Sequence, residues 1–117
     1  MITDNPLFII PFSTGLIFLV IGFIMLKFPP KKINTLYGYR TVASMKSQKR
    51  WDFSQIYSAK EMIKIGVVLL LFSSIGCYVF PAEKIAMLLG LAFLILAVII
   101  LIFRVENKLK SQFSNEE

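Results

Sequence analysis

The sequence predicts an all-α integral membrane protein with three transmembrane helices and a cytoplasmic, amphipathic helical loop between the first two. The chain has 117 residues, of which 56% are hydrophobic, and its charged residues gather between long apolar runs. Soluble domains of this size spread their charge throughout the sequence. About 20 apolar helical residues cross a bilayer core of roughly 30 Å. The apolar runs therefore predict one membrane domain over residues 1–117, with spans at about 7–26, 62–80 and 85–103.

The first run, residues 7–26, is expected to be a retained helix and not a cleaved signal peptide. Asp4 and no Lys or Arg precede this run, and Lys27 to Pro30 follow it in place of the small residues of a cleavage site. The helix should end there, because neither of the two prolines can donate a helical hydrogen bond.

The loop after the first span, residues 27–61, is expected to start as irregular chain and then to become helical. Asn34 and Gly38 favour turns, and Gly38 can adopt a positive φ without strain. Thr41 can cap the N-terminus of a short helix over Val42 to Lys49.

A second helix start is indicated at Asp52, which can pair with Gln55 as a capping box. This signal predicts a break near Trp51 and a helix that then runs through the second span to Phe80. One unbroken helix from about Ser44 is the alternative, because no Gly or Pro interrupts this entry into the span.

The short turn at Pro81 to Lys84 requires the second and third spans to be antiparallel neighbours. Ala82, Ala86 and Gly90 recur at four-residue spacing on the third helix, and such small residues allow close helix packing in lipid. We favour packing within the chain, with a homodimer interface as the alternative. The cytoplasmic tail, residues 104–117, ends in polar residues that are expected to fray.

The distribution of basic residues predicts the orientation. Nine of the thirteen Lys and Arg residues lie between Lys27 and Lys64, and none precedes Leu7. Positively charged loops remain in the cytoplasm, so the N-terminus should be outside, and the long loop and the C-terminus inside. The chain is thus expected to be a multi-pass protein of the cytoplasmic membrane. Its net charge of +6 suits a bilayer with anionic head groups, and no direct nucleic-acid partner is needed to explain it.

The residue types do not indicate an enzyme. Cys77 is the single cysteine and histidine is absent, which excludes a disulfide within one chain and argues against a His/Cys metal site. No catalytic set, cofactor motif or phosphate-binding loop is recognisable, so we expect no catalytic, cofactor-binding or metal-binding residues. No ionisable residue lies deep in a predicted span, which argues against proton-coupled transport. Glu61 is interpreted as the counter-charge of Lys60 and Lys64.

The most unusual segment runs from Asn34 to Lys60, where three of the four tyrosines and the only tryptophan lie among basic residues. An interfacial loop would have this composition, but that interpretation explains Gly38-Tyr39-Arg40-Thr41 less well. There a turn glycine precedes an arginine and a helix cap. Arg40 is therefore predicted to tie down the loop through paired hydrogen bonds to a carboxylate or to carbonyl groups. Trp51 is predicted to help hold the loop against the helices.

The segment resembles the SdpI/YfhL family of bacterial membrane proteins. The shared pattern is an Asn, a Gly-x-Arg-Thr, a Ser/Thr and a Lys, and then a Trp that leads into a helix. In this chain the matching residues are Asn34, Gly38, Arg40, Thr41, Ser44, Lys46, Trp51 and Lys60. The chain departs from the pattern where Val42 stands for a proline, Gln55 and Ile56 for an Asn-Arg pair, and Ala59 for a glycine.

The resemblance implies a bacterial immunity protein that protects against a membrane-active toxin peptide and signals to a cytoplasmic repressor protein. It also implies that the eight motif residues form the family's partner-binding region. Two other functions stay open at this point. The chain could serve as a small membrane assembly partner, or as a component of an oligomeric transporter.

Overall fold

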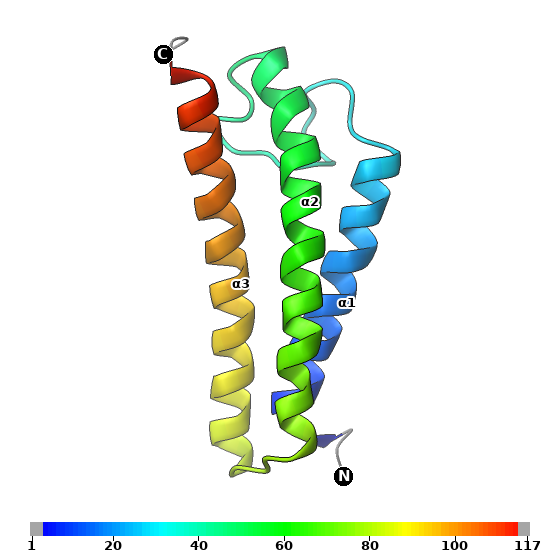
Figure 1. Ribbon diagram of the computed structural model, residues 1–117, viewed down its shortest axis with the longest axis vertical. Coiled ribbons are helices and arrows are strands. Elements are labelled where there is room, and N and C mark those ends of the chain that lie inside the picture. Colours follow the sequence, from blue (N-terminus) through cyan, green and yellow to red (C-terminus); the bar gives the residue numbers. More distant parts are fainter. Residues whose placement is uncertain (1–3, 115–117) are drawn as a thin grey trace.

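Three α-helices and the connections between them make up residues 4–114, the part of the chain that this computed structural model describes. They are α1 (Pro6–Lys27), α2 (Gln48–Ser73) and α3 (Glu83–Gln112), and a short 3-10 helix, η2 (Ser74–Cys77), continues α2. The helices run side by side along the longest dimension of a molecule that measures 51 × 25 × 21 Å (Figure 1). The predicted all-α class is confirmed for the described residues, which include no strand.

Two helices within residues 4–114, α1 and α3, are long and apolar enough to cross a membrane. The helix α2 is 26 residues long, but about its first two thirds carry charged and polar side chains, from Gln48 to Lys64. Helix length and composition therefore support the first and third predicted spans but not the second.

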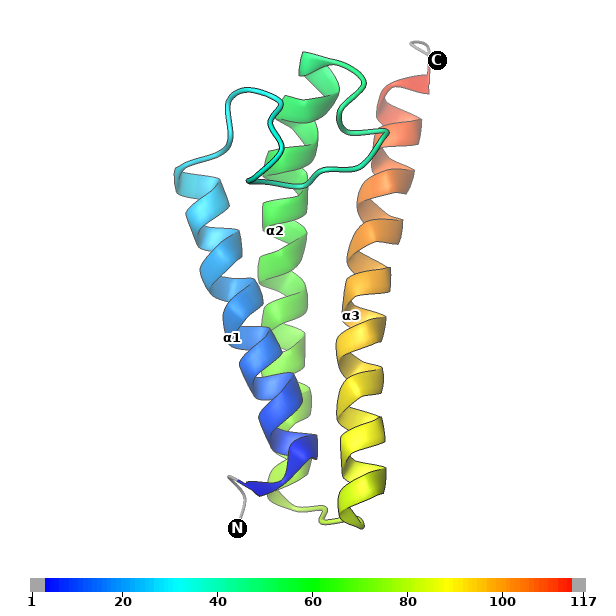
Figure 2. The ribbon, with the colours of Figure 1, turned by 180° about the vertical axis from the view of Figure 1, so that it is seen from behind.

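The connections lie at opposite ends of the bundle (Figures 1 and 2). The start of α1 and the α2–α3 turn share one end, while the α1–α2 loop, residues 28–47, and the end of α3 share the other. Every basic residue of the long loop is thus at the end of the molecule where α3 finishes.

Glycines bring α1 and α2 into close backbone contact. A Cβ atom added at Gly15 would lie 2.8 Å from the Gly66 carbonyl oxygen, and one added at Gly66 would lie 2.9 Å from the Gly15 carbonyl oxygen. On α3, a Cβ at Gly90 would lie 2.8 Å from the Pro6 carbonyl oxygen, and Ala86 is fully buried. The prediction that small residues serve packing within the chain is confirmed for Ala86 and Gly90, whereas Ala82 is exposed.

The prediction that the second helix reaches Phe80 is wrong, because regular α-helix ends at Ser73. The chain closes into η2, and the backbone of Gly76 lies against Phe8 so tightly that a Cβ there would be 2.6 Å from the Phe8 Cβ. Asn5 binds the carbonyl groups at this end, since its Nδ2 donates to the carbonyl oxygens of Gly76 and Val79 at 3.0 Å each. This contact fastens the start of α1 to the end of η2.

The predicted break near Trp51 is also wrong. The helix α2 begins at Gln48, where the Ser47 hydroxyl accepts from the Arg50 amide at 3.2 Å, and it continues through Trp51 without interruption. The unbroken helix is therefore the correct alternative, with a start later than Ser44. Asp52 is not a cap, and it accepts a hydrogen bond from the side chain of Gln48 at 2.7 Å.

The short helix predicted over Val42 to Lys49 is replaced by a single turn at residues 42–45. Thr41 caps this turn as expected, because its Oγ1 accepts from the Ser44 amide at 3.2 Å. The turn cannot extend into a helix, since Ser47 has an extended backbone with φ −152° and starts α2 in its place.

The prediction that the polar tail from Lys108 onward is frayed is wrong as far as Gln112, because α3 continues to that residue. Val105 and Leu109 in this last part are fully buried and join a core with Phe18, Leu69, Ala97 and Leu101. The loop covers these side chains, so the end of α3 is packed on two sides. Residues 115–117 of the predicted tail lie outside the described residues.

Candidate functional site: the loop folded over the end of the bundle

Trp51 fastens the loop where it leaves α1. The indole is fully buried, and its Nε1 donates to the Pro30 carbonyl oxygen at 2.7 Å. Pro29 and Pro30 have already ended α1, so this carbonyl has no helical partner. The predicted role of Trp51 in holding the loop against the bundle is confirmed.

Gln55 binds the next segment of the loop through its side-chain amide, which pairs with both the amide and the carbonyl group of one residue, as a neighbouring strand would. Its Oε1 accepts from the Tyr39 amide at 2.6 Å, and its Nε2 donates to the Tyr39 carbonyl oxygen at 2.8 Å. Gly38 allows this approach, since its φ is +110° and an added Cβ would lie 2.5 Å from the Gln55 Oε1. A side chain at residue 38 would therefore strain the backbone and displace Gln55.

Glu106 joins the loop to α3. Its Oε2 accepts from the Tyr39 hydroxyl at 2.7 Å and from Thr41 Oγ1 at 2.8 Å. Burial of the Tyr39 phenol, together with the hydrogen bond to the Glu106 carboxylate and its negative charge, raises the pKa of Tyr39 above the ordinary value. The phenol therefore stays a hydrogen-bond donor at all physiological pH values.

Ser44 closes the turn that presents Tyr39 and Thr41. Its hydroxyl is buried, accepts from the Thr41 amide at 2.9 Å, and lies 3.1 Å from the Tyr39 carbonyl oxygen to which it can donate. One small hydroxyl group thus satisfies polar backbone atoms that the turn would otherwise bury unpaired.

Arg50 makes the contact that was predicted for Arg40. The Arg50 side chain is 2% exposed, its Nη2 donates to the Phe113 carbonyl oxygen at 3.3 Å, and its guanidinium lies 5.5 Å from the centre of the Phe113 ring. Arg40 is exposed and has no hydrogen bond or ion pair within residues 4–114. Tyr39 occupies the inward position of this segment, so its neighbour Arg40 is left at the surface.

The structure divides the eight motif residues into three sets. Gly38, Thr41, Ser44 and Trp51 come together at the junction of the loop with α2 and α3, whereas Asn34 forms a separate local turn. The Asn34 Oδ1 accepts from the Leu36 and Tyr37 amides at 2.9 and 2.7 Å. The remaining side chains are exposed, and they are Arg40, Lys46 and Lys60. Their predicted role in binding a partner stays a prediction.

A charged cluster lies below the loop, between α2 and α3. Glu61 is 1% exposed, its Oε2 lies 3.3 Å from the Lys64 Nζ, and its Oε1 accepts from the Arg104 Nε. The interpretation of Glu61 as a counter-charge is confirmed for Lys64. Arg104 is a second partner that the sequence does not indicate, because it lies 43 positions from Glu61 and gives no local sign of the contact.

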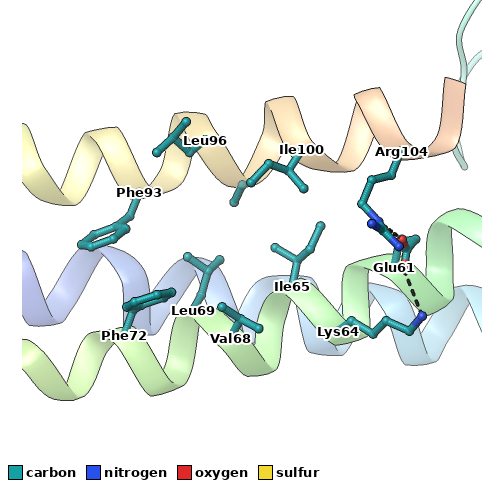
Figure 3. A pocket seen from close by; sticks show the side chains of 11 residues that line it. Glu61, Lys64, Ile65, Val68, Leu69, Phe72, Phe93, Leu96, Ile100 and Arg104 are labelled. Carbon is teal, nitrogen blue, oxygen red and sulfur yellow. Dashed lines mark hydrogen bonds and ion pairs between the residues drawn. The ribbon is translucent and has the colours of Figure 1, made fainter. Parts of the chain in front are cut away.

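An apolar groove continues from this cluster between α2 and α3 (Figure 3). Its volume is about 400 Å³. Val68, Leu96 and Ile100 line its middle, and the stacked rings of Phe72 and Phe93, 5.4 Å apart at their centres, close the far end. The groove is polar at the Glu61 end only.

Besides Trp51, other side chains hold the loop, and the sequence pattern does not indicate this role for them. The pattern favours a capping-box role for Gln55 and singles out none of Tyr39, Arg50 and Glu106. The one sequence feature that could have indicated a contact between α3 and the loop is Glu106, an acidic residue that follows an apolar run and lies far from the basic loop in sequence. Such a carboxylate needs donors nearby once it is partly buried.

Comparison with known proteins assigns the chain to a family. A model of the SdpI/YfhL protein family matches residues 31–104, which is more than half of the chain and includes the loop, α2 and most of α3. An uncharacterized protein YfhL from Bacillus subtilis (strain 168) is 44% identical over 55 residues, which are 47% of this chain and 50% of the relative. The match thus spans about half the length of that relative. No solved structure matches the chain. The chain belongs to the SdpI/YfhL protein family.

Proposed function

We propose that this SdpI-type membrane protein crosses the bacterial cytoplasmic membrane three times and protects the cell from a membrane-active toxin peptide. Family membership carries the proposal, since the resemblance to this family implies immunity. The apolar side chains that α1 and α3 expose along their length support a place in lipid, and among them Val20, Phe23, Ile99 and Phe103 are each more than half exposed.

A third span by α2 is consistent with where its charges lie. Glu61 and Lys64 are held at the same level as Arg104, which follows the apolar run of α3 (Figure 3). From Ile65 to Phe80 the chain carries no charge. If the cluster sits at one membrane border, α2 and η2 reach the other without placing a charge in the hydrocarbon core.

The proposed orientation has the N-terminus outside and the C-terminus inside. The loop end of the bundle holds most basic residues, and the opposite end holds Asp4, Glu83 and Lys84. Lys- and Arg-rich connections stay in the cytoplasm. A secreted peptide would then meet the α2–α3 turn first, where the side chains of Phe80 and Glu83 are exposed.

The test of immunity is survival of a toxin-sensitive bacterium that expresses the protein, challenged with a panel of membrane-active peptides. We expect protection by the wild type, weaker protection by Phe80→Ala and Glu83→Gln, and unchanged protection by Lys46→Gln and Lys49→Gln at matched membrane levels. If the wild type protects against no peptide and a pull-down recovers a stable membrane complex, an assembly partner or an oligomeric transporter component replaces this proposal.

We also propose that the loop carries a signal to a cytoplasmic repressor protein. The observation that favours this role is an exposed surface on the firmly held loop and the first turn of α2, since the side chains of Arg40, Val42, Lys46 and Lys49 are all exposed. Basic side chains around an 83% exposed valine suit an acidic protein surface. Lys46→Glu with Lys49→Glu should abolish recovery of a repressor in pull-downs while cell protection remains. Equal recovery would contradict signalling through this surface.

A further inference from the structure

The groove between α2 and α3 has the length of one bilayer leaflet. Phe72 follows Glu61 by eleven residues, which is about 16 Å at roughly 1.5 Å of rise per helical residue. Half of the hydrocarbon core measures about 15 Å. With the Glu61 cluster at the cytoplasmic border, the stacked rings of Phe72 and Phe93 lie near the middle of the membrane. The groove therefore faces the cytoplasmic leaflet alone.

The mouth of the groove presents positive charge. The side chains of Lys64 and Arg104 are 71% and 52% exposed, whereas that of Glu61 is 2% exposed beneath them. Glu61 balances one of the two cations, which leaves one net positive charge at the surface. Lys108 follows Arg104 by one helical turn, is exposed, and lines a neighbouring hollow together with Arg104.

Glu61 also orients the two cations. One carboxylate oxygen accepts from the Arg104 Nε and the other pairs with the Lys64 Nζ, so a single buried group fixes both side chains at the rim (Figure 3). Arginine and lysine held in this way form a preorganised receptor for a phosphate oxygen.

We propose that this groove binds one anionic phospholipid of the cytoplasmic leaflet. One acyl chain lies along Val68, Leu96 and Ile100 and ends against the two phenylalanine rings, and the phosphate group lies against Arg104 and Lys64. The charge of the mouth, the apolar walls and the single-leaflet length together select an anionic lipid over a zwitterionic one. The inference rests on the proposed membrane orientation and is independent of toxin immunity.

Native mass spectrometry of the purified protein, exchanged into equal amounts of phosphatidylglycerol and phosphatidylcholine with the same acyl chains, tests this site. The wild type should retain one phosphatidylglycerol per chain. Lys64→Gln leaves the Glu61–Arg104 pair in place and should lower the ratio of phosphatidylglycerol-bound to lipid-free protein about fivefold, the scale of one basic contact with an anionic surface. Lys49→Gln removes the same charge away from the groove and should leave the ratio unchanged.

A second pair of variants tests the groove itself. Ile100→Trp fills the groove at a half-exposed position, so it should abolish lipid retention while circular dichroism shows an intact helical fold. Ile99→Trp, on an exposed position outside the groove, should retain the lipid. Equal retention of both lipids by the wild type, or equal loss in Lys49→Gln, would overturn the proposal. A lipid-free dimer that Ile100→Trp dissociates would do the same, because a second copy would then cover the groove. Cell survival reads out immunity separately.

Discussion

At the loop junction, single side chains form the hydrogen bonds that backbone groups would form in a helix or a sheet. Gln55 pairs with both polar backbone groups of Tyr39, and Trp51 donates to the carbonyl oxygen of Pro30. Ser44 closes the turn that follows Tyr39. The bond of Trp51 is buried and the others are partly buried, and an unpaired buried group costs about 1 to 3 kcal/mol. The stability of the loop therefore depends on a few residues whose loss leaves a partner unsatisfied.

Trp51 is the residue whose loss should cost most. Trp51→Ala removes a fully buried ring and should lower the free energy of unfolding by about 3 kcal/mol. Trp51→Phe keeps most of the apolar volume, loses the hydrogen bond to Pro30 and should cost about 1 kcal/mol. Thermal and denaturant unfolding in detergent measure both. Wild-type stability of both variants would mean that the loop is a solvated strip at the membrane surface.

Arg40 in the loop and Arg50 in the first turn of α2 should respond differently to the same change. Arg50→Lys keeps the charge but loses the planar group that reaches Phe113, so it should lower the free energy of unfolding by about 1 kcal/mol. Arg40→Lys changes an exposed side chain and should stay within about 0.5 kcal/mol of the wild type. The same unfolding assay compares the pair. A larger loss for Arg40→Lys would contradict the assignment of the tie to Arg50.

Tyr39 should make the protein sensitive to alkaline pH. Its pKa is raised in the folded chain, whereas the unfolded chain releases the proton at about pH 10. The stabilising contribution is therefore complete below pH 10 and is lost as the pH rises above that value. The difference in unfolding free energy between the wild type and Tyr39→Phe, measured at pH 8 and pH 11, should shrink or reverse at the higher pH. An unchanged difference would show that Tyr39 ionises normally.

At the scale of helices, α1 and α2 form the firm pair of the bundle. Gly15 and Gly66 bring the two backbones into contact, and Gly22 lies close enough to α2 that a Cβ would be 3.0 Å from the Ala59 carbonyl oxygen. Between α2 and α3 larger side chains leave the groove open below Arg104. Close backbone packing on one side of α2 thus coexists with a space for a ligand on the other.

Gly66→Leu should separate α1 from α2. The new side chain has no room beside Gly15 and Leu19, and overpacking of this kind costs about 1 to 3 kcal/mol or more. Val67→Leu enlarges a neighbouring exposed side chain by one carbon and should leave the melting temperature unchanged. Thermal unfolding in detergent compares the two. Equal melting temperatures would mean that the contact between the glycines is not required.

At the scale of the whole molecule, the two ends differ in charge and in construction. One end carries the basic loop, the buried hydrogen bonds of Tyr39 and Glu106, and the end of α3. The other end is closed by Asn5, which binds the carbonyls of Gly76 and Val79. If the bundle spans the membrane, the hydrocarbon core of about 30 Å keeps these ends apart, so coupling between them must pass through the helices.

Labelling of introduced cysteines should establish the orientation. In a Cys77→Ser background, a cysteine at Lys84 should react with a membrane-impermeant maleimide on intact cells, and a cysteine at Ser111 should react only after the membrane is permeabilised. A cysteine at Thr3, which lies outside the described residues, should behave like the one at Lys84. Equal labelling at Lys84 and Ser111 on intact cells would contradict three crossings.

Local signals in the sequence were sufficient for only part of the helical structure. Apolar runs, the prolines at residues 29 and 30, and the capping hydroxyl of Thr41 each act on residues nearby in the sequence, so the helical class, the end of α1 and the capping role of Thr41 were predicted correctly. The same signals gave a wrong start and a wrong end for α2, and a short helix where the chain forms a single turn. The family was also recognisable, because its motif is a pattern of spacings within one short segment.

Tertiary structure alone decided which side chains hold the loop and where the groove lies. The hydrogen bonds of Glu106 join residues 67 and 65 positions apart, and that of Gln55 to Tyr39 joins residues 16 apart, distances over which sequence carries no periodic signal. Arg40 and Arg50 are the same residue type only ten positions apart, and the packing of Tyr39 and Phe113 makes one exposed and the other buried. Local propensity acts along the chain, whereas burial depends on every segment that folds over a residue, and this determined both the junction and the groove.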